Sequence, residues 1–370
     1  MTEAIQKKRF SGGYAKEPPS AERFVALDGV RGVAAMMVLI LHSAMVFPNA
    51  FLAVDLFFML SGFVLAHGYG DRIGDGAGRK RFVIARLIRL YPLYLAGCLI
   101  ALPVAIGIAI YGWSYFTLPV VALATITAPF FIILPYDGYT IPLNPPGWSL
   151  TFELIANALF LLVGTKPGRV VPVLLVSAPL LLLGMHLYDG GTTGWHSFWG
   201  AFPRTFFSFF MGVLLYRLWR GGRLPRLAVP VLLILALVVA MCVLQPAHYR
   251  NYQALAVFAI NPAIIWLGAC CTVRGVTAKA CEYLGMLSYG VYVVHVPIIM
   301  WVEGIRFLAI SASAQEYIPT GATAWASIPI SLVVAHYLSV RFDVAARRWL
   351  AARFLTRSHA SAPALQGSPA

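Results

Sequence analysis

Apolar runs long enough to cross a lipid bilayer recur along almost the whole chain, separated by short polar loops. A transmembrane helix needs about 20 mostly apolar residues, so each run is a candidate membrane-spanning helix. The candidates are 30–47, 51–67, 91–111, 115–135, 147–164, 169–187, 198–216, 227–244, 253–272, 283–302 and 322–340. The pattern predicts an all-α, polytopic transmembrane helical bundle, with no internal repeat and no boundary for a second folded domain.

Lysine and arginine are distributed unevenly among the loops between these runs. Most of them lie in the tails and in the loops 68–82, 165–169, 217–226, 273–282 and 341–357. The loops 48–50, 136–146 and 188–197 contain none. Because cytoplasmic loops of membrane proteins are rich in Lys and Arg, we expect the basic loops and both termini on the cytoplasmic side.

Two cytoplasmic termini require an even number of crossings, whereas the chain has eleven apolar runs. The basic loops place the conflict in 82–135, which must cross an odd number of times. One of its two apolar pieces is therefore expected to be re-entrant or interfacial, and RFVIARLIRLYP has an amphipathic start of that kind. We expect about ten spans, with a cytoplasmic tail at 1–22, a transmembrane domain at 23–345 and a second cytoplasmic tail at 346–370.

The composition supports a membrane protein and excludes other classes. The chain is 60% hydrophobic and 11% charged, with a mean hydropathy of +0.78, whereas soluble domains average about 25% charged residues. The net charge of +14 does not indicate nucleic-acid binding, because the basic residues follow the positive-inside pattern. The five cysteines lack metal-like spacing, so we predict neither a metal site nor a disulfide framework.

The segment Leu27–Gly62 carries four ionisable residues on two apolar helices joined at Pro48-Asn49: Asp28, Arg31, His42 and Asp55. Ionisable groups inside a bilayer are costly, so each is a candidate functional residue. Arg31 and His42 are eleven residues apart, close to three helical turns. They therefore share a face and lie roughly 16 Å apart along the axis. His42 and Asp55 are nearly symmetric about the turn and are expected at the same depth.

The predicted topology sorts the ionisable residues into two polar layers. Five groups on five helices fall at one depth, roughly 9–10 Å from the periplasmic face by helical rise. These are His42, Asp55, Glu153, Arg204 and His295. Three arginines collect near the cytoplasmic face: Arg31, Arg86 and Arg89. We expect the layers to be connected through the interior of the bundle.

Five motifs occur in one order along the chain: LDGVRGVAAMMVLILHS, VDLFFMLSGFVLA, RLIRLYP, WSLTFE and LSYGVYVVHVPI. Through these five motifs the chain resembles the membrane-bound acyltransferase-3 family over roughly residues 22–345. Members of that family O-acylate bacterial cell-surface polysaccharides, lipopolysaccharide and other glycans. The chain departs from the pattern in its last helix. Many relatives have Tyr…Glu-x-Pro there, and this chain has Tyr337…Arg341-Phe342-Asp343.

The resemblance implies roles for particular residues. The arginine-x10-histidine signature falls on Arg31 and His42, and the Arg-x-x-Arg signature on Arg86 and Arg89. The remaining matches are Trp148, Ser149 and Glu153 of the tryptophan-to-glutamate motif, and Arg204 and Gly212 of PRTFFSFFMG. We expect Asp28, Trp148, Arg204 and His295 to form a polar layer with a substrate-binding or structural role.

These features together predict an integral O-acyltransferase of the bacterial inner membrane. It would move an acyl group, with acetyl favoured by the resemblance, from acyl-CoA to a hydroxyl of a surface or exported glycan. Acyl-CoA would be a co-substrate, with no permanently bound cofactor. Arg31, Arg86 and Arg89 would bind the donor, because guanidinium groups suit phosphate recognition. His42 would act as general base, with Asp55 or Glu153 holding its tautomer.

The residues leave several alternatives open. His42 could instead accept the acyl group itself, and Asp28 could be only the N-cap of the first helix. Asp55 and Glu153 could form ion pairs with Arg204 rather than act in catalysis. The buried charges would also suit a transporter or flippase for a glycan or acyl intermediate, although the chain lacks the repeated halves common in transporters. A catalytically inactive scaffold would not need the Arg31/His42 pair.

Overall fold

The computed structural model describes most of the chain. The described residues are 23–70, 73, 76–112, 116–135, 140–164, 166–187, 198–310 and 321–355. The tail at 1–22, the loop 188–197 and the end of the second tail therefore lie outside them. Within the described ranges all regular structure is helical, which confirms the all-α prediction.

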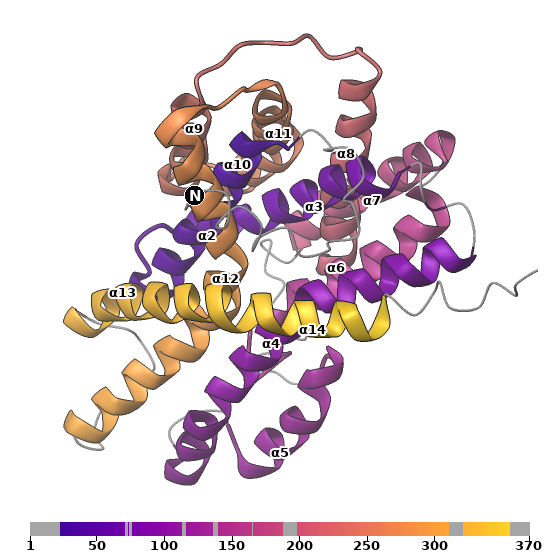
Figure 1. Cartoon of the computed structure of the whole chain (residues 1–370). Helices are drawn as coiled ribbons and strands as arrows, with labels where there is room; N and C mark the ends of the chain where they lie inside the picture. Colours follow the sequence, from indigo (N-terminus) through magenta and orange to yellow (C-terminus); the bar gives the residue numbers. More distant parts are fainter. Residues whose placement is uncertain are drawn as a thin grey trace, which may run out of the picture.

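The helices are labelled as in Figure 1. They are α2 (Val25–Ala44), α3 (Ala53–Tyr69), α4 (Gly76–Tyr111), α5 (Leu118–Thr127), α6 (Gly147–Leu159), α7 (Pro167–Leu187), α8 (Phe198–Arg220), α9 (Val231–Val243), α10 (Tyr249–Leu255), α11 (Asn261–Cys270), α12 (Gly275–Ile310), α13 (Ala322–Tyr337) and α14 (Val344–Phe354). Short 3₁₀-helices occupy Pro48–Leu52 and Ala128–Phe130, and π-helices occupy Phe160–Gly164, Ala256–Ile260 and Leu338–Asp343.

In the described ranges, nine helical segments are long and apolar enough to cross a membrane, and two more apolar helices are shorter. The first apolar piece of 82–135 belongs to α4, which continues without a break from its basic start to Tyr111. The second piece contains the short helix, Leu118–Phe130. The amphipathic start at RFVIARLIRLYP is thus part of a long helix, and the piece too short to cross is the one that follows it.

The predicted span 227–244 is also shorter than expected. The α-helix begins only at Val231, because Pro230 takes an extended conformation at its N-cap. Its 13 residues rise roughly 20 Å, well below the 30 Å hydrocarbon thickness. The apolar run therefore includes a non-helical start that hydropathy alone does not reveal.

The first two helices form an antiparallel hairpin. Helix α2 ends where Met45 takes a left-handed conformation (φ 55°), and the 3₁₀-helix Pro48–Leu52 leads into α3. At the other end of the hairpin, Phe24 packs against Phe63 and His67, with ring centroids 5.1 Å apart in both contacts. His42 and Asp55 therefore both lie close to the same connection.

Two further helices extend this hairpin and run parallel to its members. Helix α12 lies beside α2, and α8 lies beside α3. Gly62 and Gly212 allow α3 and α8 to approach closely, since a Cβ on either would overlap a backbone carbonyl of the other helix. Such small-residue contacts replace the hydrophobic effect in helix association within lipid. The four helices hold the candidate site.

Candidate active site

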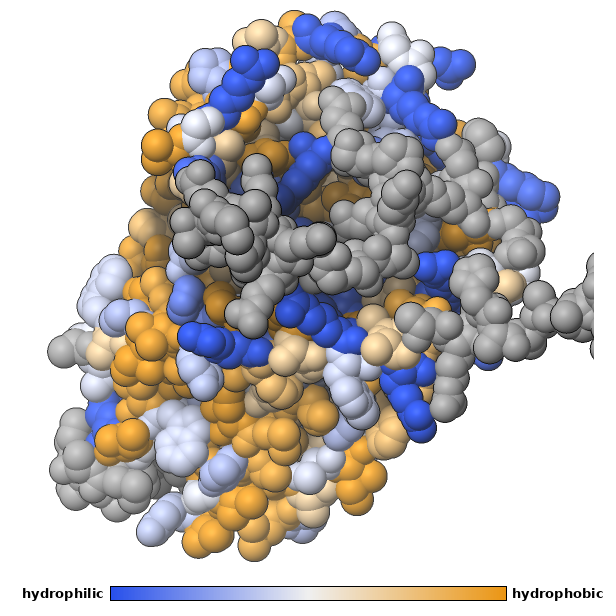
Figure 2. Space-filling view, in the orientation of Figure 1, coloured by the Kyte–Doolittle hydropathy of each residue, from blue (hydrophilic) through white to orange (hydrophobic). Residues whose placement is uncertain are grey.

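A cavity of about 620 Å³ opens between α2, α3, α4, α6, α12 and the α13–α14 rod. Its lining follows α3 from Val54 to His67, a rise of roughly 20 Å along that helix. Charged side chains line much of the cavity: Arg23, Asp28, Arg31, Arg86, Arg89, Glu153, Asp343 and Arg347. On this face of the molecule, hydrophilic residues lie across the middle and along the upper and right edges, while apolar residues cover the left and lower parts (Figure 2). The cavity lining is therefore both charged and apolar, since Leu27, Val54, Phe57 and Leu60 line it as well.

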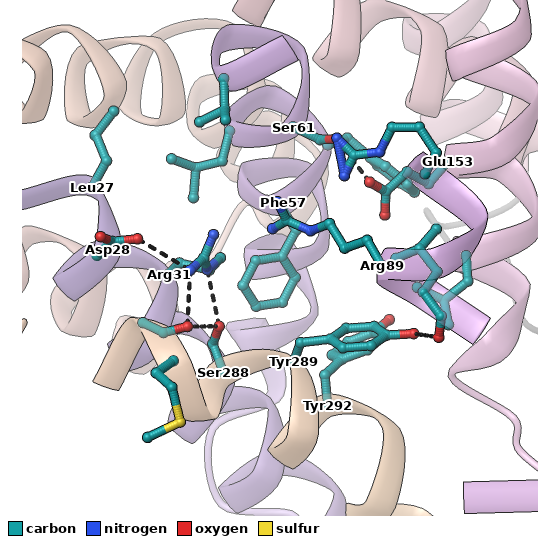
Figure 3. Close-up of a pocket in the computed structure, with 18 of the residues that line it drawn as sticks. Leu27, Asp28, Arg31, Phe57, Ser61, Arg89, Glu153, Ser288, Tyr289 and Tyr292 are labelled. Atoms are coloured by element: carbon teal, nitrogen blue, oxygen red, sulfur yellow. Dashed lines mark hydrogen bonds and ion pairs between the residues drawn. The ribbon is translucent and has the colours of Figure 1, made fainter. Parts of the chain in front are cut away.

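Asp28 and Arg31 form one wall, opposite Arg89 and Glu153 (Figure 3). Arg31 donates to Asp28 Oδ1 at 3.1 Å and to the Gly285 carbonyl at 2.8 Å through Nη2, and to Ser288 Oγ at 2.9 Å through Nε. Asp28 Oδ2 accepts a second bond from Arg23, at 3.1 Å. Helix α2 starts at Val25 with Phe24 as its N-cap, so the alternative role of Asp28 as N-cap is wrong. Its carboxylate orients two arginines.

Arg86 and Arg89 lie on α4 at positions i and i+3, so they project from neighbouring points of the helix. Arg86 is only 6% exposed, and its Nε has no hydrogen-bond partner in the described part of the chain. Neither arginine makes a hydrogen bond or an ion pair with any other described residue. Five arginines and three carboxylates line the cavity, a formal excess of two positive charges. An unpaired buried cation is unfavourable, so this region suits an anionic ligand.

Glu153 lies with these arginines rather than in the layer predicted for it. It accepts a hydrogen bond from Ser61 Oγ at 2.8 Å, and Ser61 lies roughly 9 Å farther along α3 than Asp55. The depth prediction failed because the segment 140–147 before α6 is buried. Asn144 fixes this segment by donating to the Val293 carbonyl of α12 at 2.9 Å. Helix α6 therefore starts inside the bundle and not at its surface.

Asp55 and Arg204 form a buried ion pair between α3 and α8. Arg204 Nε lies 3.0 Å from both carboxylate oxygens, and its Nη2 donates to Oδ2 at 2.5 Å. Ser208 donates to Oδ1 at 3.1 Å. Asp55 is 0% and Arg204 2% exposed. Of the two carboxylates considered as ion-pair partners of Arg204, Asp55 forms the pair and Glu153 does not.

His42 pairs with another histidine instead of a carboxylate. Its Nδ1 lies 3.0 Å from the Val38 carbonyl and 3.1 Å from Nε2 of His295. Nδ1 of His295 in turn lies 3.0 Å from the Val291 carbonyl. Among the described residues neither Asp55 nor Glu153 is hydrogen-bonded to His42. The sequence analysis did not predict that His42 pairs with His295, because the local sequence of a helix does not show which other helices pack against it.

The carbonyl contacts assign the tautomers of this histidine pair. A carbonyl oxygen only accepts, so each Nδ1 must carry the proton. Nε2 of His295 is then an acceptor for the His42 Nδ1–H, which leaves Nε2 of His42 with a free lone pair. His295 is 1% exposed, whereas His42 is exposed. The accessible histidine is therefore the one oriented to act as a base.

Tyr292 links the cavity to this histidine pair. It lines the cavity, and its ring centroid lies 6.0 Å from that of His295. Its hydroxyl is hydrogen-bonded to Ser149 Oγ at 2.7 Å. Trp148, the residue before Ser149, packs edge-on against Phe58 and Phe152. Sequence reasoning missed Tyr292, although it lies in the LSYGVYVVHVPI motif one turn before His295.

The last helix adds a carboxylate where the family pattern is broken. The π-helix Leu338–Asp343 joins α13 and α14 into one continuous rod (Figure 1). Asp343 lies at its end, lines the cavity, and binds Arg347 through contacts of 2.8 and 2.5 Å. The segment Arg341-Phe342-Asp343, where the chain departs from the family pattern, therefore contributes Asp343 to the cavity wall. Within the described ranges no cluster of three or more His, Cys, Asp or Glu could hold a metal ion.

These features define a polytopic membrane protein with a basic cavity in its interior that ends one helical turn short of a histidine pair. The chain matches the model of the acyltransferase-3 domain over residues 24–340, and it belongs to that acyltransferase family. It is 38% identical over 193 residues to "Protein 2 in picA locus" of Rhizobium radiobacter, covering 46% of this chain and 97% of the relative.

A second relative is the acyltransferase MdmB of Streptomyces mycarofaciens. It is 30% identical over 155 residues, which cover 37% of this chain and 38% of the relative. No solved structure shows significant similarity to the chain. Family and relatives identify the chain as a multi-pass membrane acyltransferase that transfers groups other than aminoacyl groups.

Proposed function

We propose that this enzyme moves an acyl group, with acetyl as the first candidate, from acyl-CoA to a hydroxyl of a surface or exported glycan. It would act in the bacterial inner membrane, with acyl-CoA as a co-substrate and no permanently bound cofactor. The observation that carries the proposal is the cavity, which has unpaired Arg86 and Arg89 at one end and the His42–His295 pair beyond the other.

The donor would enter at the arginine end. The positive-inside rule favours a cytoplasmic position for this end, and acyl-CoA is made on that side. The CoA phosphates would supply the negative charge that buried Arg86 lacks, and paired guanidinium groups suit phosphate oxygens. An extended pantetheine arm is of the same order as the roughly 20 Å cavity. The thioester would then lie close to Tyr292 and the histidines.

The glycan hydroxyl would enter from the opposite side, next to exposed His42. Nε2 of His42 takes the hydroxyl proton while the hydroxyl oxygen attacks the thioester carbonyl. The new C–O bond forms, the C–S bond breaks, and the CoA thiolate takes the proton back from His42. His295 would hold the Nδ1–H tautomer of His42 throughout. The glycan acceptor is supported by the family resemblance.

The test compares cells that lack the chain with cells that carry wild-type protein or His42→Ala. Mass spectrometry of surface and exported glycans should reveal an ester only with wild-type protein, and its mass identifies the acyl group. His42→Ala should accumulate normally, because His42 contributes no ion pair to the fold.

His186→Ala is the matched control, since His186 is exposed on α7 and does not line the cavity. It should leave the ester unchanged. The same ester in His42→Ala cells would exclude His42 as the base. No ester that depends on the chain would overturn the proposed function.

A further inference from the structure

The cavity ends at aromatic rings just before it reaches the histidines. Phe57, Phe58 and Tyr292 belong to its lining, whereas His42 and His295 do not. His295 lies one helical turn beyond Tyr292 on α12. An acyl group that enters from the arginine end must therefore pass these rings to reach His42.

Two of the rings form a fixed pair. Phe57 of α3 and Tyr292 of α12 pack edge to face, with centroids 5.5 Å apart and planes at 80°. Ser149 of α6 holds the Tyr292 hydroxyl at 2.7 Å and itself donates to the Pro146 carbonyl at 2.9 Å. Tyr292 is only 7% exposed. Three helices thus limit how far either ring can move.

We propose that the Phe57–Tyr292 pair, anchored by Ser149, is the constriction that selects the length of the transferred acyl group. This inference rests on the proposed function. Because the two rings are in contact, any acyl chain must part them, and each added methylene requires a larger displacement of rings that three helices hold. In apolar sites one methylene is worth about 10- to 200-fold in discrimination. The pair therefore favours acetyl over longer chains.

The experiment raises the intracellular pools of propionyl- and butyryl-CoA by feeding the carboxylates. The acyl-CoA pools and the glycan esters are then measured in the same cells. Wild-type protein should give acetyl esters in excess of the acetyl share of the pool. Phe57→Leu should raise the butyryl-to-acetyl ester ratio about tenfold, because a smaller side chain widens the passage.

Tyr292→Phe and Ser149→Ala test the anchor and keep both rings. Tyr292→Phe removes both contacts of the hydroxyl, at 2.7 Å to Ser149 and at 3.4 Å to the Pro146 carbonyl, whereas Ser149→Ala leaves the second. Tyr292→Phe should therefore raise the ratio about threefold, and Ser149→Ala should raise it by a smaller amount. These two variants carry the test if Phe57→Leu does not accumulate. Phe207→Leu is the control, because Phe207 is a buried ring paired with Phe258 at 4.3 Å and does not line the cavity.

The outcomes separate this inference from the proposed function. If Phe57→Leu, Tyr292→Phe and Ser149→Ala all keep the wild-type ester ratio, the inference is overturned while acyl transfer stands. Wild-type esters that simply follow the composition of the pool overturn it in the same way. No ester dependent on the chain in any cell overturns both. A shifted ratio in the three variants, with Phe207→Leu unchanged, supports the constriction.

Discussion

Two sets of charged residues lie at different levels along α3, and only one of them is neutralised within the described protein. Asp55 is fully buried, and its carboxylate is matched by Arg204 and Ser208. Roughly 9 Å farther along the helix, Ser61 contacts Glu153 in a cavity where Arg86 and Arg89 have no ion-pair partner among the described residues. The first set satisfies its charges inside the protein, so it stabilises the fold. The second leaves cations unsatisfied, so it can bind a ligand.

The strongest test of this difference is to break the satisfied pair. Arg204→Ala leaves the buried Asp55 carboxylate without a countercharge, with Ser208 still donating to it, and breaking a buried ion pair in this way typically costs about 3–5 kcal/mol. We expect the purified protein to lose that much stability, measured by unfolding in detergent. Asp55→Leu combined with Arg204→Leu should recover most of the loss, because a well-packed apolar pair removes both buried charges. A double variant as unstable as Arg204→Ala would mean that the pair does more than neutralise charge.

The unsatisfied arginines should behave in the opposite way. Arg86→Ala removes a buried charge that has no hydrogen-bond or ion-pair partner among the described residues, with only the nearby Glu153 carboxylate to attract it, so the empty protein should lose far less stability than Arg204→Ala does. Binding of CoA should weaken by about 10- to 100-fold, the range expected for a charge-assisted hydrogen bond. Calorimetry with CoA and thermal unfolding without it measure the two effects separately.

Arg348→Ala is the control for this experiment, because Arg348 is exposed on α14 and does not line the cavity. It should change neither quantity. A loss of stability in Arg86→Ala comparable to that of Arg204→Ala would contradict the contrast between the two sets. The double variant Arg86→Ala, Arg89→Ala should weaken use of the acyl donor more than it weakens use of the acceptor.

The sequence predicted what depends on periodicity and failed where distant segments meet. Hydropathy predicted the all-α membrane bundle, and helical spacing predicted that Arg31 and His42 share a helix but lie at different depths. Glu153 was misplaced because its preceding segment, IPLNPPG, resembles a surface loop but is buried against α12. The partner of His42 was missed because a contact between residues 253 positions apart depends on the packing of α2 beside α12. Local patterns carry no information about such neighbours.

The smallest effect is expected at the Asp343–Arg347 pair in the cavity wall. Asp343 is paired with Arg347, whose side chain is 34% exposed, and this pair lies between the satisfied and unsatisfied cases. Because Arg347 is partly exposed while Asp343 is buried, the pair should contribute far less than the buried Asp55–Arg204 pair, so Asp343→Asn should cost about 1 kcal/mol. It releases Arg347 and removes a negative charge from the lining, so CoA should bind about threefold more tightly at low salt. High salt should abolish the gain, because it screens charges at exposed sites. Tighter binding that persists in high salt would place Asp343 in direct contact with the donor.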